Sequence, residues 1–179
     1  MKILYILAFA IASLFAVSAD DVRNWDQIGQ YNRICQESVR NLFIEEQSEA
    51  LANMYAKACL KMDKVNELVV PTVMLYKTKE ARENASLYST IIFQKKMLYL
   101  ALCDGVDISY IRTPKINYIL SEIFDKFTER AYVKKSDTYV FTLENGERAE
   151  LFIKEEEEVK KMVIAIYAGD KLSSIKIYW

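Results

Sequence analysis

Histidine, the commonest general base in enzymes, does not occur among the 179 residues of the chain. Without it the chain cannot form a Ser-His-Asp or Cys-His catalytic group, and most catalytic zinc sites lose a ligand. We therefore expect no catalytic residues, no bound metal and no cofactor. The sequence favours a protein that does not catalyse a reaction.

Acidic residues are the remaining groups that could carry out hydrolysis, because a glycosidase needs only two carboxyl groups. They are dense in two stretches, residues 45–49 and 155–158. Adjacent acids of this kind are typical of a solvated turn. Neither stretch has the alternating Asp or Asn and the glycine of a calcium-binding loop. A hydrolase that uses carboxylates alone is therefore our third functional hypothesis.

The three cysteines, Cys35, Cys59 and Cys103, allow one disulfide and leave one thiol over. Cys59 and Cys103 each fall near the C-terminal end of a predicted helix, so parallel packing of these helices would bring them level. We predict a Cys59–Cys103 disulfide with Cys35 free. The alternative is three small, buried thiols. A catalytic thiol is not expected, because no histidine is present to activate it.

A bond between Cys35 and Cys59 would require the chain to turn back near Ser48. If residues 31–62 formed one continuous helix, these two cysteines would lie about 36 Å apart, which is beyond disulfide reach. The stretch around Ser48 contains no Gly, Pro or Asn, which slightly favours a continuous helix. Both arrangements, one helix or a helical hairpin, remain open.

Two short motifs have a chemical meaning that their context does not support. Residues 173–176 (SSIK) have the Ser-x-x-Lys spacing of an activated serine, but they fall in a predicted strand rather than at the start of a helix. Residues 84–86 (NAS) form an N-glycosylation sequon, but they fall in a predicted helix. We assign a function to neither motif.

Aromatic side chains are the best candidates for a contact surface, because Tyr combines an apolar ring with a hydroxyl that can hydrogen-bond. Packing in the core is the alternative for each of them. The candidate interface residues are Tyr76, Tyr110, Tyr118, Tyr178 and Trp179. Basic residues are spread along the chain rather than clustered, which argues against nucleic acid as a partner.

The first 19 residues have the layout of a secretory signal peptide. Lys2 is followed by an apolar run from Ile3 to Phe15, and Val17-Ser18-Ala19 is typical of a cleavage site. An uncleaved membrane anchor is the alternative, but the run is short for a membrane-spanning helix. We expect an exported chain without a membrane span after cleavage. The expected compartment is the periplasm, with the extracellular space as the alternative.

The longest helical pattern runs from Thr78 to Gly105, where apolar residues recur three or four positions apart. Thr78 is a candidate N-cap, and Gly105 is typical of a helix end. A second clear helix is predicted from Pro114 to Tyr132, with Thr113 as its N-cap.

The segments on either side of residues 31–62 have weaker patterns. Residues 20–29 are polar and could form a loose arm or a first helical turn. Leu68–Pro71 is predicted to be extended, because the residue before a proline avoids the helical region. Residues 72–77 form at most a short helix.

From Lys134 onwards apolar and polar residues alternate, which is the period of a β-strand. Asn145-Gly146 lies between two such segments and is a strong hairpin signal. We predict four antiparallel strands within residues 134–179. The expected apolar face of this meander consists of Tyr139, Phe141, Leu143, Leu151, Ile153, Ile175 and Ile177. It needs a cover, which we expect the helix 114–132, the central helix or both to supply.

These patterns predict a single α+β domain over residues 20–179, in which about four helices (residues 20–133) pack on the meander (residues 134–179). Our functional hypothesis is an exported, non-enzymatic module that binds another protein, of the inhibitor or immunity-protein kind. The alternative is a carrier of a small apolar ligand between sheet and helices. A filled core with an exposed aromatic patch would favour the first, and a large cavity behind the sheet would favour the second. The oligomeric state is left open.

Cleavage of the signal peptide predicts that the mature chain begins at Asp20. Intact-mass measurement on protein recovered from its natural host checks this N-terminus. A mass that still includes Met1 would overturn the export prediction. It would also remove the expectation that an oxidising compartment favours a disulfide.

Overall fold

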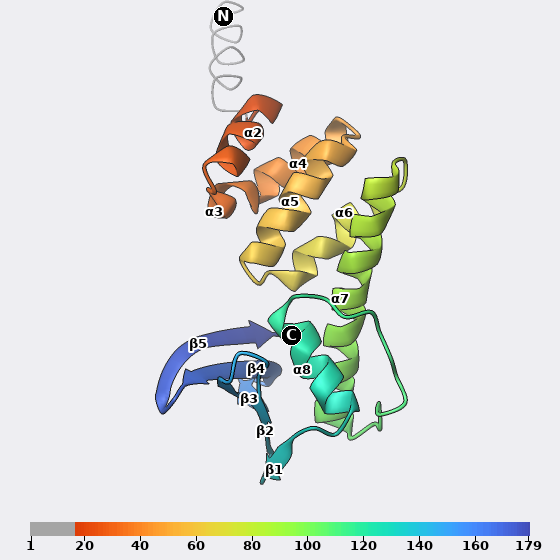
Figure 1. Ribbon diagram of the computed structural model, residues 1–179. Helices are drawn as coiled ribbons and strands as arrows, with labels where there is room; N and C mark the ends of the chain where they lie inside the picture. The colour runs from red at the N-terminus through yellow and green to blue at the C-terminus, as the bar shows by residue number, and fades with distance from the viewer. Residues whose placement is uncertain (1–16) are drawn as a thin grey trace, which may run out of the picture. The chain divides into compact units, whose positions relative to one another are not determined.

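The computed structural model describes residues 17–179, in which the helices come first and the strands last (Figure 1). These residues form seven α-helices, one 3-10 helix and a five-stranded antiparallel sheet. The α+β class is confirmed, whereas the predicted four strands and roughly four helices are too few. Residues 1–16, most of the predicted signal peptide, lie outside the described range. Among the described helices, none is both long and apolar enough to span a bilayer.

The chain divides into two compact units, the first ending at Tyr88 and the second beginning at Ser89. The boundary falls inside the longest helix, α7 (Lys79–Asp104). That the two units fold together as one domain stays a prediction.

The first unit is built around α5, which contacts the other helices of the unit up to α6. The elements are α2 (Ala19–Gln27), α3 (Tyr31–Ile34), α4 (Glu37–Glu45), α5 (Glu49–Lys61), the 3-10 helix η2 (Val65–Leu68) and α6 (Val69–Met74). Their shared core is apolar and excludes water. Its fully buried side chains include Val22, Ile34, Val39, Phe43, Leu51, Tyr55 and Leu68.

The polar residues that follow the predicted cleavage site form helix α2 rather than a loose arm. Ser18 is its N-cap, because the Ser18 hydroxyl accepts the backbone N–H of Asp21 at 3.2 Å. The carboxylate of Asp21 in turn accepts the backbone N–H of Ser18 at 3.0 Å. This reciprocal capping box satisfies two amides that the helix itself leaves unpaired.

The chain turns back at Ser48, so the slightly favoured continuous helix over residues 31–62 is wrong. Helix α4 ends at Glu45, and Gln47 has a positive φ of 49°. The Ser48 hydroxyl then accepts the backbone N–H of Leu51 and caps α5. The acidic stretch therefore contains both a helix end and a helix start without any Gly or Pro.

Residues 68–71 are helical rather than extended, which also corrects the sequence-based expectation. Pro71 is the third residue of α6 and is buried. In the first turn of a helix a backbone N–H has no partner within the helix, so a proline there forfeits no hydrogen bond. The restriction that a proline places on its preceding residue is a preference, and burial of Leu68 and Pro71 outweighs it here.

The predicted central helix is confirmed as α7. The Thr78 hydroxyl accepts the backbone N–H of Ala81 at 3.0 Å, as expected of an N-cap. At the other end Gly105 follows the helix with a φ of 68°. That left-handed conformation is one that glycine adopts at little cost.

The second unit contains the C-terminal part of α7, helix α8 (Ile119–Thr128) and the sheet. The predicted start of α8 at Pro114 is wrong, because residues 113–118 form a loop. Thr113 does not cap a helix. Its hydroxyl accepts a hydrogen bond at 2.7 Å from the side-chain amide of Gln94, which is fully buried on α7. Hydrogen bonding to the buried Gln94 amide therefore prevails over the local Thr-Pro signal for a helix start.

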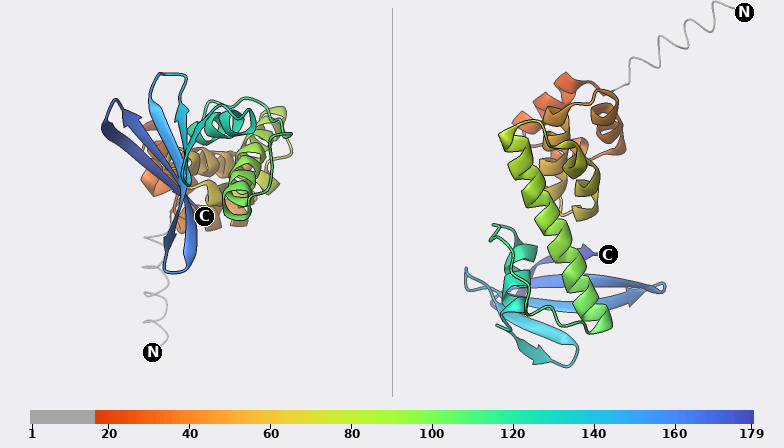
Figure 2. Two further views of the ribbon diagram at one scale, coloured as in Figure 1. Left: turned by 90° about the horizontal axis from the view of Figure 1, so that it is seen from below. Right: turned by 90° about the vertical axis from the view of Figure 1, so that its right-hand side faces the viewer.

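The five strands follow one another in the sheet in the order of the sequence, and all neighbours are antiparallel. They are β1 (Val133–Lys135), β2 (Thr138–Thr142), β3 (Arg148–Glu156), β4 (Val159–Ala168) and β5 (Lys171–Tyr178). Each connection is a short hairpin, as Figure 2 shows. The predicted Asn145-Gly146 turn joins β2 to β3, and Gly146 has a φ of 83°.

The hairpin between β3 and β4 has an unusual turn. Glu156 pairs with Val159, so Glu157 and Glu158 alone form the loop, and both have a positive φ (50° and 66°). Two such residues are required by a type I′ turn, which normally uses Asn-Gly. A side chain with a Cβ is strained in this conformation.

Replacing Glu158 with glycine should therefore stabilise the protein. The relief of strain exceeds the extra chain entropy of glycine, and we expect a gain of about 0.5–1 kcal/mol in the free energy of unfolding. Urea denaturation checks it. The matched control is Glu155→Gly within strand β3, which should destabilise; equal effects of both variants would contradict the argument.

Replacing Phe124, which is completely buried in α8, with Asp should unfold the sheet together with the helix. Loss of a buried Phe costs about 3–5 kcal/mol even without a buried charge, which rivals the net stability of a domain. Hydrogen exchange of residues 138–178 measures whether the sheet unfolds. Tyr110→Asp, at an exposed site, is the control. Retained protection of the strands would show that the sheet is an independent module. Protection of residues 31–68 in the same variant reports whether the two units unfold together.

Candidate interaction surface

One face of the sheet, here called the inner face, packs against α8 and the second half of α7 (Figures 1 and 2). The Phe127 ring of α8 lies 5.0 Å from the Tyr139 ring of β2, measured between centroids. The Tyr99 hydroxyl of α7 donates to the Lys160 carbonyl oxygen at 2.7 Å. The buried inner-face residues are Phe141, Ala149, Leu151, Met162, Ile164, Ile166 and Tyr178.

The side chains of strand β5 face the opposite sides of the sheet from those that we expected. Ile175 and Ile177 were expected on the covered face, but they pair with Ala165 and Val163, whose side chains point away from the helices. Directly paired residues of an antiparallel ladder share a face. The residue that faces the helices is Tyr178, which pairs with the inner-face residue Met162 and is buried.

The opposite face of the sheet is apolar as well. The apolar residues of this outer sheet face include Val140, Phe152, Val163, Ala165, Ile175 and Ile177. Ile175 is 51% exposed and Ile177 is 44% exposed, whereas Val163 between Phe152 and Ile177 is only 4% exposed. Among the described residues of this unit, no helix lies over the outer sheet face (Figure 2).

The charged residues among these strands are paired with one another. Arg148 Nη1 lies 2.7 Å from Glu150 Oε1, and Glu156 receives Lys161 Nζ at 2.6 Å and Lys154 Nζ at 2.5 Å. Hydrogen bonds from Lys154 and Lys161 lower the pKa of Glu156 to about 2. Within this cluster three cations share two carboxylates, so each charge has a partner and the formal net charge is +1.

Aromatic rings flank the face at both ends. The Arg148 guanidinium lies 4.2 Å from the centre of the Tyr167 ring, and Lys161 Nζ lies 6.0 Å from the centre of the Trp179 ring. Each cation thus contacts a ring face in the geometry of a cation–π interaction. Trp179 remains 56% exposed.

Two polar contacts hold the end of β5 against the helices. Lys95 of α7 is almost completely buried, and its ammonium donates to the Trp179 carbonyl oxygen. The hydroxyls of Tyr118 and Tyr178 lie 3.2 Å apart. With Tyr178 turned inward in this way, alternation along the strand directs Ile177 and Ile175 outward.

Within the second unit, the structure does not gather the four predicted interface aromatics into one surface. Tyr118 and Tyr178 contact each other on the inner side of the sheet, where Tyr178 is buried. Tyr110 is exposed in the loop that precedes α8, and Trp179 lies at the end of the outer sheet face. Tyr76 is exposed in the first unit, just after α6. Of the four in the second unit, Trp179 alone belongs to the candidate surface.

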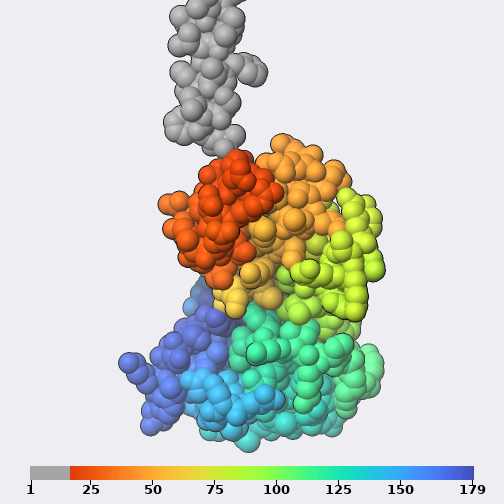
Figure 3. Space-filling view, turned by 45° about the horizontal axis from the view of Figure 1, so that its top comes forward, coloured from red at the N-terminus to blue at the C-terminus, as the bar shows by residue number. Residues whose placement is uncertain are grey.

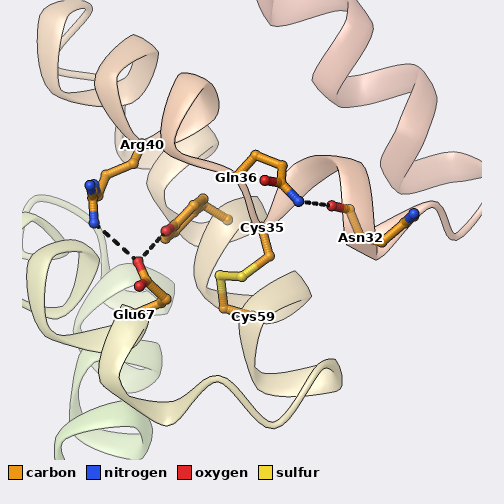
Figure 4. The surroundings of a disulfide bond; sticks show 7 residues. Asn32, Cys35, Gln36, Arg40, Cys59 and Glu67 are labelled. Atoms are coloured by element: carbon orange, nitrogen blue, oxygen red, sulfur yellow. Dashed lines mark hydrogen bonds and ion pairs between the residues drawn. A yellow bond between two sulfur atoms is a disulfide. The ribbon is translucent and has the colours of Figure 1, made fainter.

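The disulfide joins Cys35 to Cys59 in the first unit (Figure 4). This corrects the predicted Cys59–Cys103 pair, and Cys103 is the free thiol. The turn at Ser48 folds α4 and α5 together, which brings the Cα atoms of Cys35 and Cys59 to 5.0 Å. A loop of this length contributes about 3 kcal/mol in the chain-entropy account.

A half-buried ion pair lies beside the disulfide, as Figure 4 shows. The Glu67 carboxylate accepts the Tyr55 hydroxyl at 2.5 Å and Arg40 Nη1 at 3.3 Å. Burial and then this carboxylate raise the pKa of Tyr55 far above its usual value. The arrangement joins α4, α5 and η2 and is structural.

The acidic stretches have structural partners rather than a shared catalytic geometry. The Glu49 carboxylate accepts the backbone N–H groups of Tyr76 and Lys77 at 2.6 and 2.7 Å. Glu156 is held by two lysines, as described above. Among the described residues, no group of three or more His, Cys, Asp or Glu is arranged to hold a metal ion.

The two short motifs, residues 84–86 and 173–176, both lie in regular secondary structure. The Asn84 amide nitrogen, which would carry a glycan, donates to Asn53 Oδ1 at 3.0 Å, and the Tyr88 hydroxyl donates to the same atom. Residues 173–176 lie in strand β5. The geometry therefore supports neither glycosylation nor an activated serine.

A cleft of about 580 Å³ lies between α8, the loop before it and the turn joining β2 to β3. Figure 3 shows where the teal surface of residues 105–128 adjoins the light-blue hairpin. Its lining includes five carboxylates, Glu122, Asp125, Glu129, Glu144 and Glu147. Burial, followed by the charge of Glu129, raises the pKa of Asp125. The cleft is open and polar.

Sequence reasoning missed the outer sheet face, although one signal pointed to it. Residues 162–166 (MVIAI) are five consecutive apolar residues and all are buried. A strand that is apolar at every position has two apolar faces, so the sheet needs cover on both. The burial of Lys95 on α7 was not predicted either, because a lysine is almost never fully buried unless it has a partner.

The chain matches no protein-family model, no curated protein and no solved structure in the three comparisons.

The buried Lys95 predicts a particular dependence of stability on pH. Burial, followed by the charge of Lys96, lowers the pKa of Lys95 to about 8 from 10.5. Between these values the unfolded chain binds a proton that the folded chain does not, so the free energy of unfolding rises with pH. Urea denaturation from pH 7.5 to 10 measures this rise. A Cys103→Ser background prevents exchange of the free thiol with the disulfide.

In Lys95→Met the Lys95 contribution to this rise should disappear. Lys96→Met, a change at the exposed neighbour, should retain most of it, because burial is the larger cause of the lowered Lys95 pKa. A pH dependence that is the same in both variants would show that Lys95 keeps its ordinary pKa.

Proposed function

We propose that this chain is an exported, non-enzymatic protein-interaction module and that the outer sheet face is its binding surface. The observation that carries the proposal is the exposure of Ile175 and Ile177 beside Val163 and Ala165 on a face with no helical layer of its own unit. A contiguous exposed apolar patch is typical of a site where a protein binds a partner. The small size and the candidate signal peptide agree with an inhibitor or immunity-type protein.

The carrier hypothesis receives less support from the packing. A carrier needs an enclosed apolar cavity between the layers. Instead, the facing residues of the two layers fill this space. Leu120, Ile123 and Phe124 of α8 and Leu151 and Ile164 of the sheet are each completely buried. Half of the residues that line the cleft beside α8 are charged, and such side chains would not stabilise an apolar ligand.

The hydrolase hypothesis also receives less support. Glu49 and Glu156, one from each acidic stretch, already accept two hydrogen bonds each from the protein. A general acid in a glycosidase needs a raised pKa, whereas the pKa of each of these two carboxyls is lowered.

The proposal is tested by affinity capture from the exported fraction of the natural host, with residues 20–179 carrying an N-terminal tag as bait. The double variant Ile175→Lys, Ile177→Lys should lower the recovery of a captured protein at least about tenfold, because each lysine interrupts an apolar contact. The matched control is Val73→Lys, at an exposed valine of the first unit.

The captured protein is then purified, and its affinity for the three baits is measured by titration. An affinity that the double variant leaves unchanged, or that Val73→Lys lowers equally, would contradict the assignment of the outer sheet face.

A further inference from the structure

We propose that the occupant of the outer sheet face is a second copy of this chain, so that the two sheets pack face to face in a symmetric dimer. This inference rests on the proposed function, because it names the partner of the same surface. The contact would be isologous, with the same residues contributed by both copies. The two sheets would lie about 10 Å apart with their strands nearly aligned, as in a β-sandwich.

The charged side chains of this cluster already have partners within the face, so they do not require an oppositely charged partner. Arg148 is paired with Glu150 at 2.7 Å, and Glu156 is paired with Lys154 and Lys161 at 2.5 and 2.6 Å. An anionic lipid surface or an acidic peptide is attracted by cations that lack a partner, and these three cations have one. A second outer sheet face carries the same internally paired charges, so packing the two requires no group to lose its counter-charge.

The available area is close to that of a specific interface. Five strands spaced about 4.8 Å apart, each with about seven residues at about 3.3 Å, give a face of about 550 Å². A standard interface buries about 800 Å² of accessible surface per partner, and projecting side chains add to the flat estimate. We therefore expect a dissociation constant in the micromolar range, on the order of 1–10 µM.

The relief of the face suits packing against its own copy. Ile175 and Ile177 on β5 project, at 51% and 44% exposed, whereas Val163 and Ala165 on the neighbouring strand are 4% and 3% exposed. The face therefore carries a ridge along β5 beside a lower strip along β4. Side chains of two inner sheet layers interdigitate in a sandwich, which a ridge beside a strip of small residues permits.

The test is sedimentation velocity of purified, disulfide-bonded residues 20–179 between 1 and 200 µM. The wild-type chain should change from monomer to dimer across this range. Ile177→Lys enters the symmetric contact twice, so a tenfold loss per copy becomes about a 100-fold or greater rise in the dissociation constant. Val73→Lys should leave the dimer unchanged.

A second variant separates loss of contact from loss of fold. Ile177→Thr keeps a β-branched side chain in the strand and should raise the dissociation constant about tenfold. The far-ultraviolet circular dichroism of every variant is compared with that of the wild type. A dimer that both Ile177 variants leave intact, or that Val73→Lys disrupts, would overturn the inference.

The outcomes also distinguish this inference from the proposed function. A chain that stays monomeric at 200 µM, but whose capture of a different protein depends on Ile177, would overturn the dimer and leave the interaction module standing. A monomer whose captured proteins are unaffected by Ile177→Lys would overturn both. A monomer that binds anionic phosphatidylglycerol vesicles through Ile177 would likewise overturn both, because the occupant would be a lipid surface.

Discussion

The second unit depends on one constraint, which is that strand β4 is apolar on both of its faces. Met162, Ile164 and Ile166 face α7 and α8, while Val163 and Ala165 face the other way. Strands with two apolar faces are typical of sheets covered by a layer on each side. Among the described residues of this unit one helical layer covers the sheet, and the outer side chains of β4 are shielded by their neighbours on β3 and β5. Phe152 and Ile177 provide that lateral cover, and their own outer surfaces remain in contact with water.

The orientation of β5 follows from a contact far from it in sequence. Burying the Lys95 ammonium is costly unless the ammonium is hydrogen-bonded, and its bond to the Trp179 carbonyl oxygen supplies a partner. The Tyr118–Tyr178 pair lies at the same end of the strand. Because side chains alternate along a strand, fixing one residue decides the face of all the others. An interior contact of α7 thus determines that Ile175 and Ile177 are presented to the outside.

The sequence could predict features that depend on nearby residues, and it failed where a distant residue competes for the same group. Thr78 caps α7 through a bond to Ala81, and Asn145-Gly146 joins β2 to β3; both features depend on residues close in sequence. Thr113 has the same local signal for a cap, but a buried amide on α7 uses its hydroxyl. The face of β5 was not predictable from alternation, since alternation defines two faces without saying which one meets the helices. The disulfide depended on the turn at Ser48, which no Gly or Pro marks.

The exposed isoleucines of β5 are not explained by the stability of the fold. Threonine is about as favourable in a strand as isoleucine, and it would leave less apolar surface in water at these half-exposed positions. An exposed apolar edge strand also carries a risk of unwanted association. At the opposite edge the sheet shows a common protection, since β1 is only three residues long and contains Lys134 and Lys135. The sheet is therefore protected against association at the β1 edge, whereas an apolar surface stays exposed beside the β5 edge. A binding function for the outer sheet face explains this difference, and folding alone does not.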